Sequence, residues 1–200
     1  LGAFEAGVKA ASGYPGTPST EILENLSKYK GVNCEWSVNE KVALEVGLGA
    51  AFAGARALVT MKHVGVNVAA DPLFTAAYTG IKGGLVIITA DEPGMHSSQN
   101  EQDNRHYARA AKVPMLEPAD SAEAKEFAKL AFEISEKYDT PVFLRTTTRI
   151  AHSMSLVEKG KRQELKVEGF TRNIRKYVQM PANARVRHVF VEDRMAELAR

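Results

Sequence analysis

Glu40 stands at the start of a run of small and apolar residues that predicts a buried helix. The run extends over residues 39–54 and carries glycines and alanines through its middle, so another backbone can approach it closely. A carboxylate at the mouth of a buried helix costs free energy unless it has a partner or a task. One such task is to hold N1′ of the aminopyrimidine ring of thiamine diphosphate. The simpler alternative is that Asn39 caps the helix and the helix dipole stabilises Glu40 as a first-turn acid.

Polar residues that follow predicted strands are the other candidates for chemistry. Lys62 and His63 come directly after an apolar strand, and a histidine there can bind a carboxylate or carbonyl, or move a proton near neutral pH. The alternative for His63 is a loop histidine that hydrogen bonds to backbone. A long polar loop over residues 90–105 contains His96 and Gln99 and has the character of a binding loop or lid. Its alternative is a solvated loop or a subunit contact.

Strands and helices alternate along the chain. The run Leu-Val-Ile-Ile-Thr at residues 85–89 is continuously apolar, as expected of a central parallel strand. Repeated strand-helix units with short connections predict an α/β fold, a parallel sheet with helices on both faces, in which ligands bind beyond the carboxyl ends of the strands. We expect strands at 12–14, 33–37, 57–61, 85–89, 115–117 and 142–145, and helices at 19–29, 40–54, 104–112 and 121–138, with a loop and then a helix over 63–79.

Composition excludes several classes of protein. The 200 residues carry a formal net charge of +2, which argues neither for nor against a nucleic-acid partner, and we expect none. No apolar run is long enough to cross a membrane, so we expect no membrane partner. The single cysteine rules out an internal disulfide and an iron–sulfur cluster, and fits a cytoplasmic location. Residues 158–200 hold 11 Lys and Arg against 6 Asp and Glu, a net charge of +5. We therefore predict a domain over residues 1–150 and, over 151–200, a basic linker or arm leading to a further domain or subunit.

Several loop sequences together resemble one known family. The string Gly13-Tyr14-Pro15-Gly16-Thr17-Pro18-Ser19-Thr20 is similar to the opening motif of the 2-oxoacid:ferredoxin oxidoreductases. Glu40 with Gly49 and Gly54 forms E-x8-G-x4-G, which is similar to the pyrimidine-contacting glutamate and helix of that family. The strings at residues 61–72 (MKHVGVNVAADP) and 89–105 (TADEPGMHSSQNEQDNR) resemble the α subunit of the branch that acts on indolepyruvate.

The resemblance implies a pyrimidine-binding domain of a thiamine-diphosphate-dependent enzyme. Such an enzyme decarboxylates an arylpyruvate oxidatively to an acyl-CoA, with coenzyme A as acyl acceptor and ferredoxin as electron acceptor. The implied partners are a homodimer mate, a diphosphate-binding domain and a β subunit. Neither a Gly-Asp-Gly motif for Mg²⁺ and diphosphate nor cysteines for iron–sulfur clusters occur here, so both are expected only in regions outside this sequence. The resemblance also implies the site residues. Catalysis falls to Glu40 and His63, and the cofactor contacts are Glu40, Gly65 and Asn67. The substrate contacts are Thr17, Lys62, His63, His96 and Gln99, and no residue is implied for a metal.

Two other functions stay open on the sequence. A non-catalytic assembly module of the same fold would use its basic tail to dock another subunit, and a different thiamine-dependent decarboxylase or transketolase half would share Glu40 but not the later loop strings. Thr17 also has a plain alternative as a turn threonine between two prolines. We expect the small residues Gly47, Ala50, Ala51 and Gly54 to lie near an open face for a partner, and Trp36 and Phe74 to be core residues.

Overall fold

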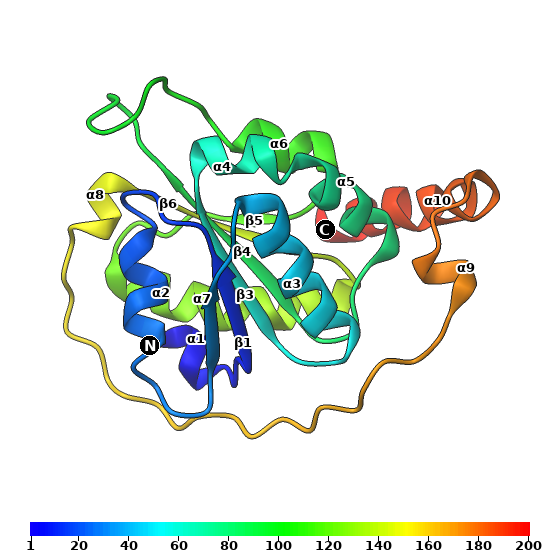
Figure 1. The fold of residues 1–200 in the computed structure, drawn as a ribbon, viewed down its shortest axis with the longest axis horizontal. Coiled ribbons are helices and arrows are strands. Elements are labelled where there is room, and N and C mark those ends of the chain that lie inside the picture. Colours follow the sequence, from blue (N-terminus) through cyan, green and yellow to red (C-terminus); the bar gives the residue numbers. More distant parts are fainter.

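A single parallel sheet forms the centre of the molecule. The computed structural model describes residues 1–200 and contains six strands in the order β2-β1-β3-β4-β6-β5, with every neighbouring pair parallel. The predicted α/β class and parallel sheet are therefore confirmed (Figure 1). The strands are β1 (Ala10–Gly13), β2 (Asn33–Trp36), β3 (Ala57–Lys62), β4 (Leu85–Asp91), β5 (Met115–Leu116) and β6 (Val142–Thr147).

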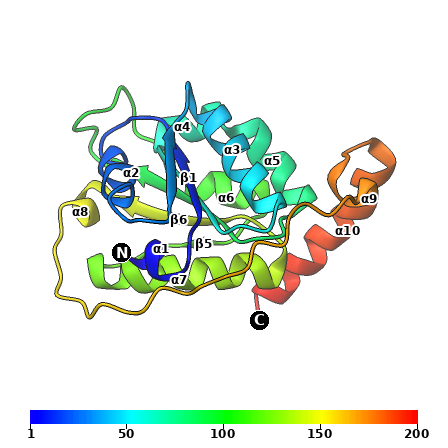
Figure 2. The ribbon, with the colours of Figure 1, turned by 60° about the horizontal axis from the view of Figure 1, so that its bottom comes forward.

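Helices cover both faces of this sheet, as Figures 1 and 2 show from two directions. One face carries α3, α4, α5 and α6, and the opposite face carries α1, α2 and α7. No helix is long and apolar enough to span a membrane. The helices are α1 (Gly2–Glu5), α2 (Thr20–Leu26), α3 (Glu40–Phe52), α4 (His63–Val68), α5 (Ala70–Thr79), α6 (Arg105–Ala111), α7 (Ser121–Tyr138), α8 (Thr148–Ala151), α9 (Ile174–Tyr177) and α10 (Pro181–Leu198).

Alternation along the strands divides the core into two clusters. In β4, Leu85 and Ile87 face α3 and α5, whereas Val86 and Ile88 face α2 and α7. In β6, Phe143 belongs to the first cluster and its neighbours in the strand to the second. Side chains of a strand point to opposite faces in turn, so a strand buried on both faces is apolar throughout. This is the physical reason why the central strands were recognisable in the sequence.

The segment after β3 is helical from its first residue, where a loop was expected. Lys62 is extended, with φ −71° and ψ 160°, and α4 begins at His63. The buried side chains of His63 and Val66 lie on the inner side of this short helix. Gly65 suggested a loop, but burial of the helix against the sheet outweighs the weak helix propensity of glycine. The helix α2 also ends at Leu26, three residues earlier than expected.

Two of the small residues of α3, Gly47 and Ala51, pack inside this molecule, so the expectation that they lie near an open face is wrong for these two. A Cβ at Gly47 would overlap the side chain of Val59, and Ala51 is completely buried. Gly54 lies beyond the end of α3 with φ +87°, a conformation that glycine adopts without strain. Small side chains here bring α3 close to β3, which fixes the position of its N-terminus over the sheet edge.

Two aromatic residues expected in the core are exposed instead. Trp36, at the end of β2, has 43 % of its surface accessible, and Phe74, on α5, has 39 %. Tyr14 and Val38, which follow β1 and β2, are exposed as well. The exposed Tyr14, Trp36 and Val38 leave a partly apolar surface at the carboxyl ends of β1 and β2.

The segment after α8 runs across the opposite, amino-terminal edge of the sheet. Residues 153–173, which we call the strap, contain no helix or strand and pass beneath the sheet in Figure 1. The backbone of Gln163 donates to the carbonyl of Glu5 at 2.8 Å, and Lys82 donates to the carbonyl of Gly169 at 2.9 Å. The strap therefore lies away from the carboxyl ends of the strands.

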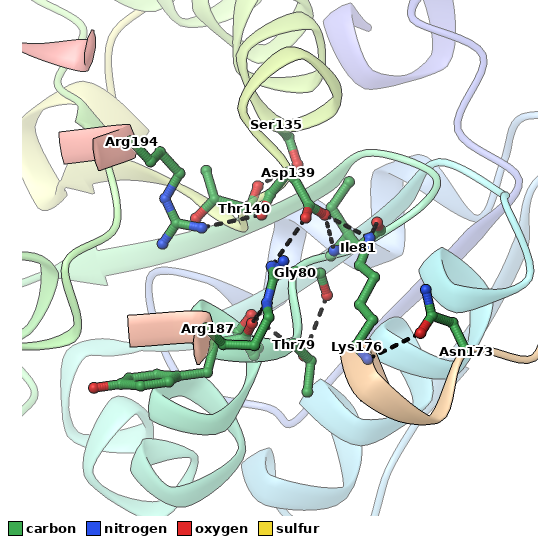
Figure 3. A network of polar contacts seen from close by, with 12 residues as sticks. Thr79, Gly80, Ile81, Ser135, Asp139, Thr140, Asn173, Lys176, Arg187 and Arg194 are labelled. Carbon is green, nitrogen blue, oxygen red and sulfur yellow. Dashed lines mark hydrogen bonds and ion pairs between the residues drawn. The ribbon is translucent and has the colours of Figure 1, made fainter. Parts of the chain in front are cut away.

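Helix α10 is anchored by charged side chains around the end of α7. Arg187 and Lys176 both bind the carboxylate of Asp139, at 3.0 and 2.8 Å (Figure 3). Arg194 is buried and donates to the carbonyls of Asp139, Ala77 and Lys112, at or beyond the C-termini of α7, α5 and α6. Burial lowers the pKa of Arg194 to about 10, so the guanidinium stays charged at neutral pH. The predicted boundary at residue 150 stays a prediction, and α10 packs closely on the body before it.

Candidate functional site

Glu40 is the first residue of α3, directly beyond the outer strands at the carboxyl edge of the sheet. The side chain of Asn39 caps the helix by accepting a hydrogen bond from the Val42 backbone at 3.0 Å. Glu40 is half-buried, and the neighbouring Lys41 pairs with Asp71 at 3.0 Å rather than with Glu40. The Asn39 cap, which belongs to the simpler alternative for Glu40, is therefore present. This cap satisfies the Val42 backbone N–H and leaves the Glu40 carboxylate unengaged.

Gly65 of α4 forms a cradle against that carboxylate. A Cβ built on Gly65 would lie 2.6 Å from both Cγ and Oε1 of Glu40 and 2.9 Å from its Cδ. Real Cβ atoms do not approach other atoms so closely, so only glycine permits this position of Glu40. A half-buried acid held at a helix start beside bare backbone suits contact with a ring nitrogen. The residues present thus fit the pyrimidine ring of thiamine diphosphate.

Lys62 lies between two loops at the same edge. Its aliphatic chain packs against Gly16, where a Cβ would lie 3.1 Å from the Lys62 Cβ. Its ammonium group donates to the carbonyl of Ser97 at 2.9 Å and lies 3.6 Å from a carboxylate oxygen of Glu92. Lys62 is only 8 % exposed. Through its contacts with Gly16 and Ser97 it joins the loop that carries Thr17 to the loop that follows β4.

The loop after β4 is organised by two buried carboxylates. Glu92 accepts hydrogen bonds from the Ser97 backbone at 3.0 Å, from the Ser97 hydroxyl at 2.7 Å and from the Ser98 hydroxyl. Despite burial, these donors and the Lys62 ammonium lower the pKa of Glu92 to about 2. Asp91 accepts from the Asn104 backbone at 3.0 Å, which ties the end of the loop to its beginning. Residues 92–104 are thus a closed loop over the ends of β3 and β4.

His63 is completely buried beneath this loop. Its Nε2 lies 3.1 Å from the carbonyl oxygen of Asn100, and its Nδ1 is buried without a hydrogen-bond partner. The backbone contact is the one expected under the alternative reading of a loop histidine, although the residue opens a helix. His63 reaches a bound molecule only if residues 92–104 move.

The remaining predicted residues are more scattered. Asn67 accepts a hydrogen bond from the Tyr107 hydroxyl at 2.5 Å, on the α6 side of α4 and away from Gly65. His96 and Gln99 are exposed on the closed loop, and Thr17 is exposed in the loop after β1. The structure therefore brings together Glu40 with Gly65, and Lys62 with Gly16 beside Thr17, but it does not bring Asn67 to Glu40.

Sequence reasoning missed a buried ion network beside the site. Arg145 donates to Asp91 at 2.6 Å and also binds Glu117, which joins the ends of β4, β6 and β5. The burial of Arg145 lowers its pKa and these carboxylates raise it, with a net increase. The available signal was the presence of charged residues at the ends of apolar strands, Asp91 and Arg145, which are seldom buried unless paired.

A cavity lies on the other face of the sheet. It measures about 650 Å³ and is lined by α1, α2, α7 and α8, and it meets the candidate site only at Thr17 and Pro18. Glu40 and Gly65 are not among the residues that line it.

Comparisons with known proteins agree on one family. Residues 1–196 match the model described as "Pyruvate flavodoxin/ferredoxin oxidoreductase, thiamine diP-bdg". The chain is 54 % identical over 200 residues to "Indolepyruvate oxidoreductase subunit IorA" of Methanothermobacter thermautotrophicus, covering 98 % of this chain and 32 % of that protein. It is 52 % identical over 193 residues to the subunit of the same name from Archaeoglobus fulgidus, covering 92 % of this chain and 31 % of that protein. The chain thus spans about a third of the length of these relatives.

Solved structures share the fold. The 2-oxoglutarate:ferredoxin oxidoreductase from Magnetococcus marinus superposes with a TM-score of 0.75 at 16 % identity, over 100 % of this chain and 43 % of that one. Benzoylformate decarboxylase from Polynucleobacter necessarius superposes with a TM-score of 0.61 at 18 % identity, over 81 % of this chain and 31 % of that one. At such identities the likeness concerns the fold alone. With the family model matching nearly every residue, the chain belongs to the thiamine-diphosphate-binding family of the pyruvate flavodoxin/ferredoxin oxidoreductases.

Proposed function

We propose that this chain is the pyrimidine-binding part of an indolepyruvate:ferredoxin oxidoreductase that converts an arylpyruvate oxidatively to an acyl-CoA. The observation that carries the proposal is the Glu40 carboxylate seated on the bare backbone of Gly65 at the carboxyl edge of the sheet. Support comes from the family model over residues 1–196 and from relatives named for indolepyruvate.

Each residue has a definite task in this proposal. Glu40 shares a proton with N1′ of the aminopyrimidine, and Gly65 gives the carboxylate room beside α4. Thiamine diphosphate, when bound, supplies the carbon nucleophile that attacks the oxoacid, while the protein sets orientation and electrostatics. Asn67 is kept as a cofactor contact only through the resemblance, since its side chain meets Tyr107.

The substrate residues surround Lys62 and the closed loop. Thr17 and Lys62 line the approach to the substrate from the loop after β1 and the end of β3. His96 and Gln99 stand exposed on residues 92–104, where they can contact a substrate from the outside. We assign His63 a proton-holding role beneath the same loop, because its Nδ1 is buried and unpartnered.

The proposed enzyme needs parts that lie outside these residues. A diphosphate-binding domain with Mg²⁺, iron–sulfur clusters and a β subunit complete it, with ferredoxin and coenzyme A as co-substrates. We also propose a homodimer. The exposed Trp36 and Val38, beyond the outer strands, give the edge near Glu40 an apolar surface suited to a second domain or copy.

The complete enzyme tests the proposal directly. Reduction of ferredoxin is followed with indolepyruvate, with pyruvate and with no oxoacid, in the presence of coenzyme A and thiamine diphosphate. We expect reduction that requires both indolepyruvate and thiamine diphosphate and is far slower with pyruvate. A complete enzyme that binds thiamine diphosphate but fails to reduce ferredoxin with either oxoacid would contradict the proposed activity. A complex that binds no thiamine diphosphate would favour an assembly module.

A further inference from the structure

A 2-oxoacid carries a carboxylate, which a protein binds with a cation or several hydrogen-bond donors. The cations near the carboxyl ends of the central strands differ in how far their charge is already neutralised. Arg145 is bound to Asp91 and Glu117, and Arg105 is bound to Asp103. Both lie on the β4, β5 and β6 side, with carboxylates as partners, so neither offers a free positive charge.

Lys62 is different because its hydrogen bonds go to uncharged oxygens. It donates to the carbonyl of Ser97 at 2.9 Å and to the Ser97 hydroxyl at 3.3 Å. The buried carboxylate of Glu92 forms an ion pair with Lys62 at 3.6 Å, beyond hydrogen-bond distance. The Lys62 ammonium thus has two neutral hydrogen-bond partners and one loose ion pair, which leaves room for a closer charged acceptor.

Glu92 does not depend on Lys62 for its hydrogen bonds. Three donors from Ser97 and Ser98 already bind its two oxygens. Lys62 can therefore change its partner without leaving a bare carboxylate in the loop. What changes is the hydrogen bond between Lys62 and Ser97, one of the contacts, with that of His63 to Asn100, that hold the closed loop over the end of β3.

The position of Lys62 suits a substrate that reacts beside Glu40. Lys62 directly precedes α4, and Gly65, three residues later, touches Glu40. Its aliphatic chain packs on Gly16, next to Thr17. The ammonium group thus stands between the loop after β1 and residues 92–104, at the same edge as the carboxylate assigned to the cofactor.

We propose that Lys62 binds the carboxylate of the 2-oxoacid, and that it does so by releasing Ser97 and so loosening residues 92–104. This inference rests on the proposed function and adds to it the group that recognises the substrate and the loop that responds. Lys62 then selects acids over neutral analogues of the same shape. Freed from Ser97, the loop that covers His63 can rearrange around the aryl group.

The experiment compares a carboxylate with its neutral isostere. Binding of indole-3-propionate and of indole-3-propionamide is measured by calorimetry in the complete enzyme loaded with thiamine diphosphate. For the wild type we expect the carboxylate to bind about 10- to 100-fold more tightly, as for a hydrogen bond to a charged group. Lys62→Met should bring that ratio to about one, and Lys62→Arg should restore most of it. Lys41→Met is the matched control, a lysine at the same edge that pairs with Asp71, and should leave the ratio unchanged.

The outcomes separate this inference from the function beneath it. If Lys62→Met weakens both compounds equally and keeps the ratio, Lys62 is structural and the inference is overturned. If the wild type itself does not distinguish the two compounds, both this inference and the oxoacid site of the proposed function are wrong. Hydrogen exchange of residues 92–104 in the wild type gives a test that needs no variant. Indole-3-propionate should speed exchange within residues 92–104 and the amide should not, and equal effects of the two would also overturn the inference.

Discussion

A methyl group at Gly65 should damage the cofactor site without damaging the fold. In Gly65→Ala the new Cβ would lie 2.6 Å from Cγ and Oε1 of Glu40 and 2.9 Å from its Cδ, so its three nearest atoms all belong to that side chain. Gly65 lies within α4 and its φ is not positive, so alanine fits the backbone. The half-buried Glu40 side chain is the group that must give way.

The size of the effect follows from that geometry. Alanine is favoured over glycine within a helix by about 1 kcal/mol, which offsets the cost of turning the Glu40 side chain aside. We expect the free energy of unfolding to change by less than about 1 kcal/mol. Ordinary carbon contacts lie at about 3.5 Å or more, so the carboxylate must shift by about 1 Å. A misplacement of about 1 Å can cost about 10²-fold in rate.

The assay pairs urea unfolding with exchange of the C2 proton of thiamine diphosphate in the complete enzyme. Gly49→Ala is the matched control, because Gly49 lies within α3 and nothing stands within 4 Å of a Cβ there. It should gain similar helix stability and exchange the C2 proton at the wild-type rate. If Gly65→Ala exchanges as fast as the wild type, Glu40 does not need its present position and our reading of the cradle is wrong.

Three further predictions concern stability and assembly. Arg194→Met should lower the free energy of unfolding by about 3 kcal/mol, measured in urea, because it leaves the carbonyls of Ala77, Lys112 and Asp139 without their buried donor; a loss below about 0.5 kcal/mol would show that α10 contributes little. The pKa of Glu92 is lowered from 4.5 to about 2 in the folded chain, so its stabilising contribution is complete above about pH 4.5 and disappears as the pH falls toward 2. Glu92→Gln should flatten this part of the stability profile, and an unchanged profile would refute the assignment. At about 10–50 µM, a concentration at which ordinary dimers form, light scattering of this chain should show a dimer. A clean monomer would count against the homodimer.

The central strands and the long helix could be predicted because local sequence patterns indicate which of their residues are buried. Residues 85–89 are apolar throughout, and Ser121–Tyr138 repeats apolar residues with the period of a helix, so both were placed within a few residues of their bounds. The helix α4 was missed because its stability comes from burial of His63 and Val66 against the sheet. A pattern of six residues with a central glycine does not reveal such packing.

The site was predictable in its elements but not in its contacts. Position after a strand pointed to Glu40 and Lys62, since parallel strands all end at one edge. Spacing cannot show that Gly65 makes room for Glu40, or that Asp91 pairs with Arg145, more than 50 residues away. The exposure of Trp36 was also missed, because residue type alone does not distinguish an exposed apolar side chain from a core one.

Exchange of the C2 proton of bound thiamine diphosphate, followed by NMR in the complete enzyme, tests the role of Glu40 most directly. Glu40→Gln keeps the shape and a hydrogen bond but cannot share a proton with N1′, so exchange should slow by about 10²- to 10⁴-fold while the fold is retained. Glu45→Gln is the control, since five residues at about 100° each turn this exposed side chain about 140° away from Glu40. It should exchange at the wild-type rate. If Glu40→Gln exchanges as fast as the wild type while Glu45→Gln is slow, the assignment of Glu40 to the cofactor is wrong.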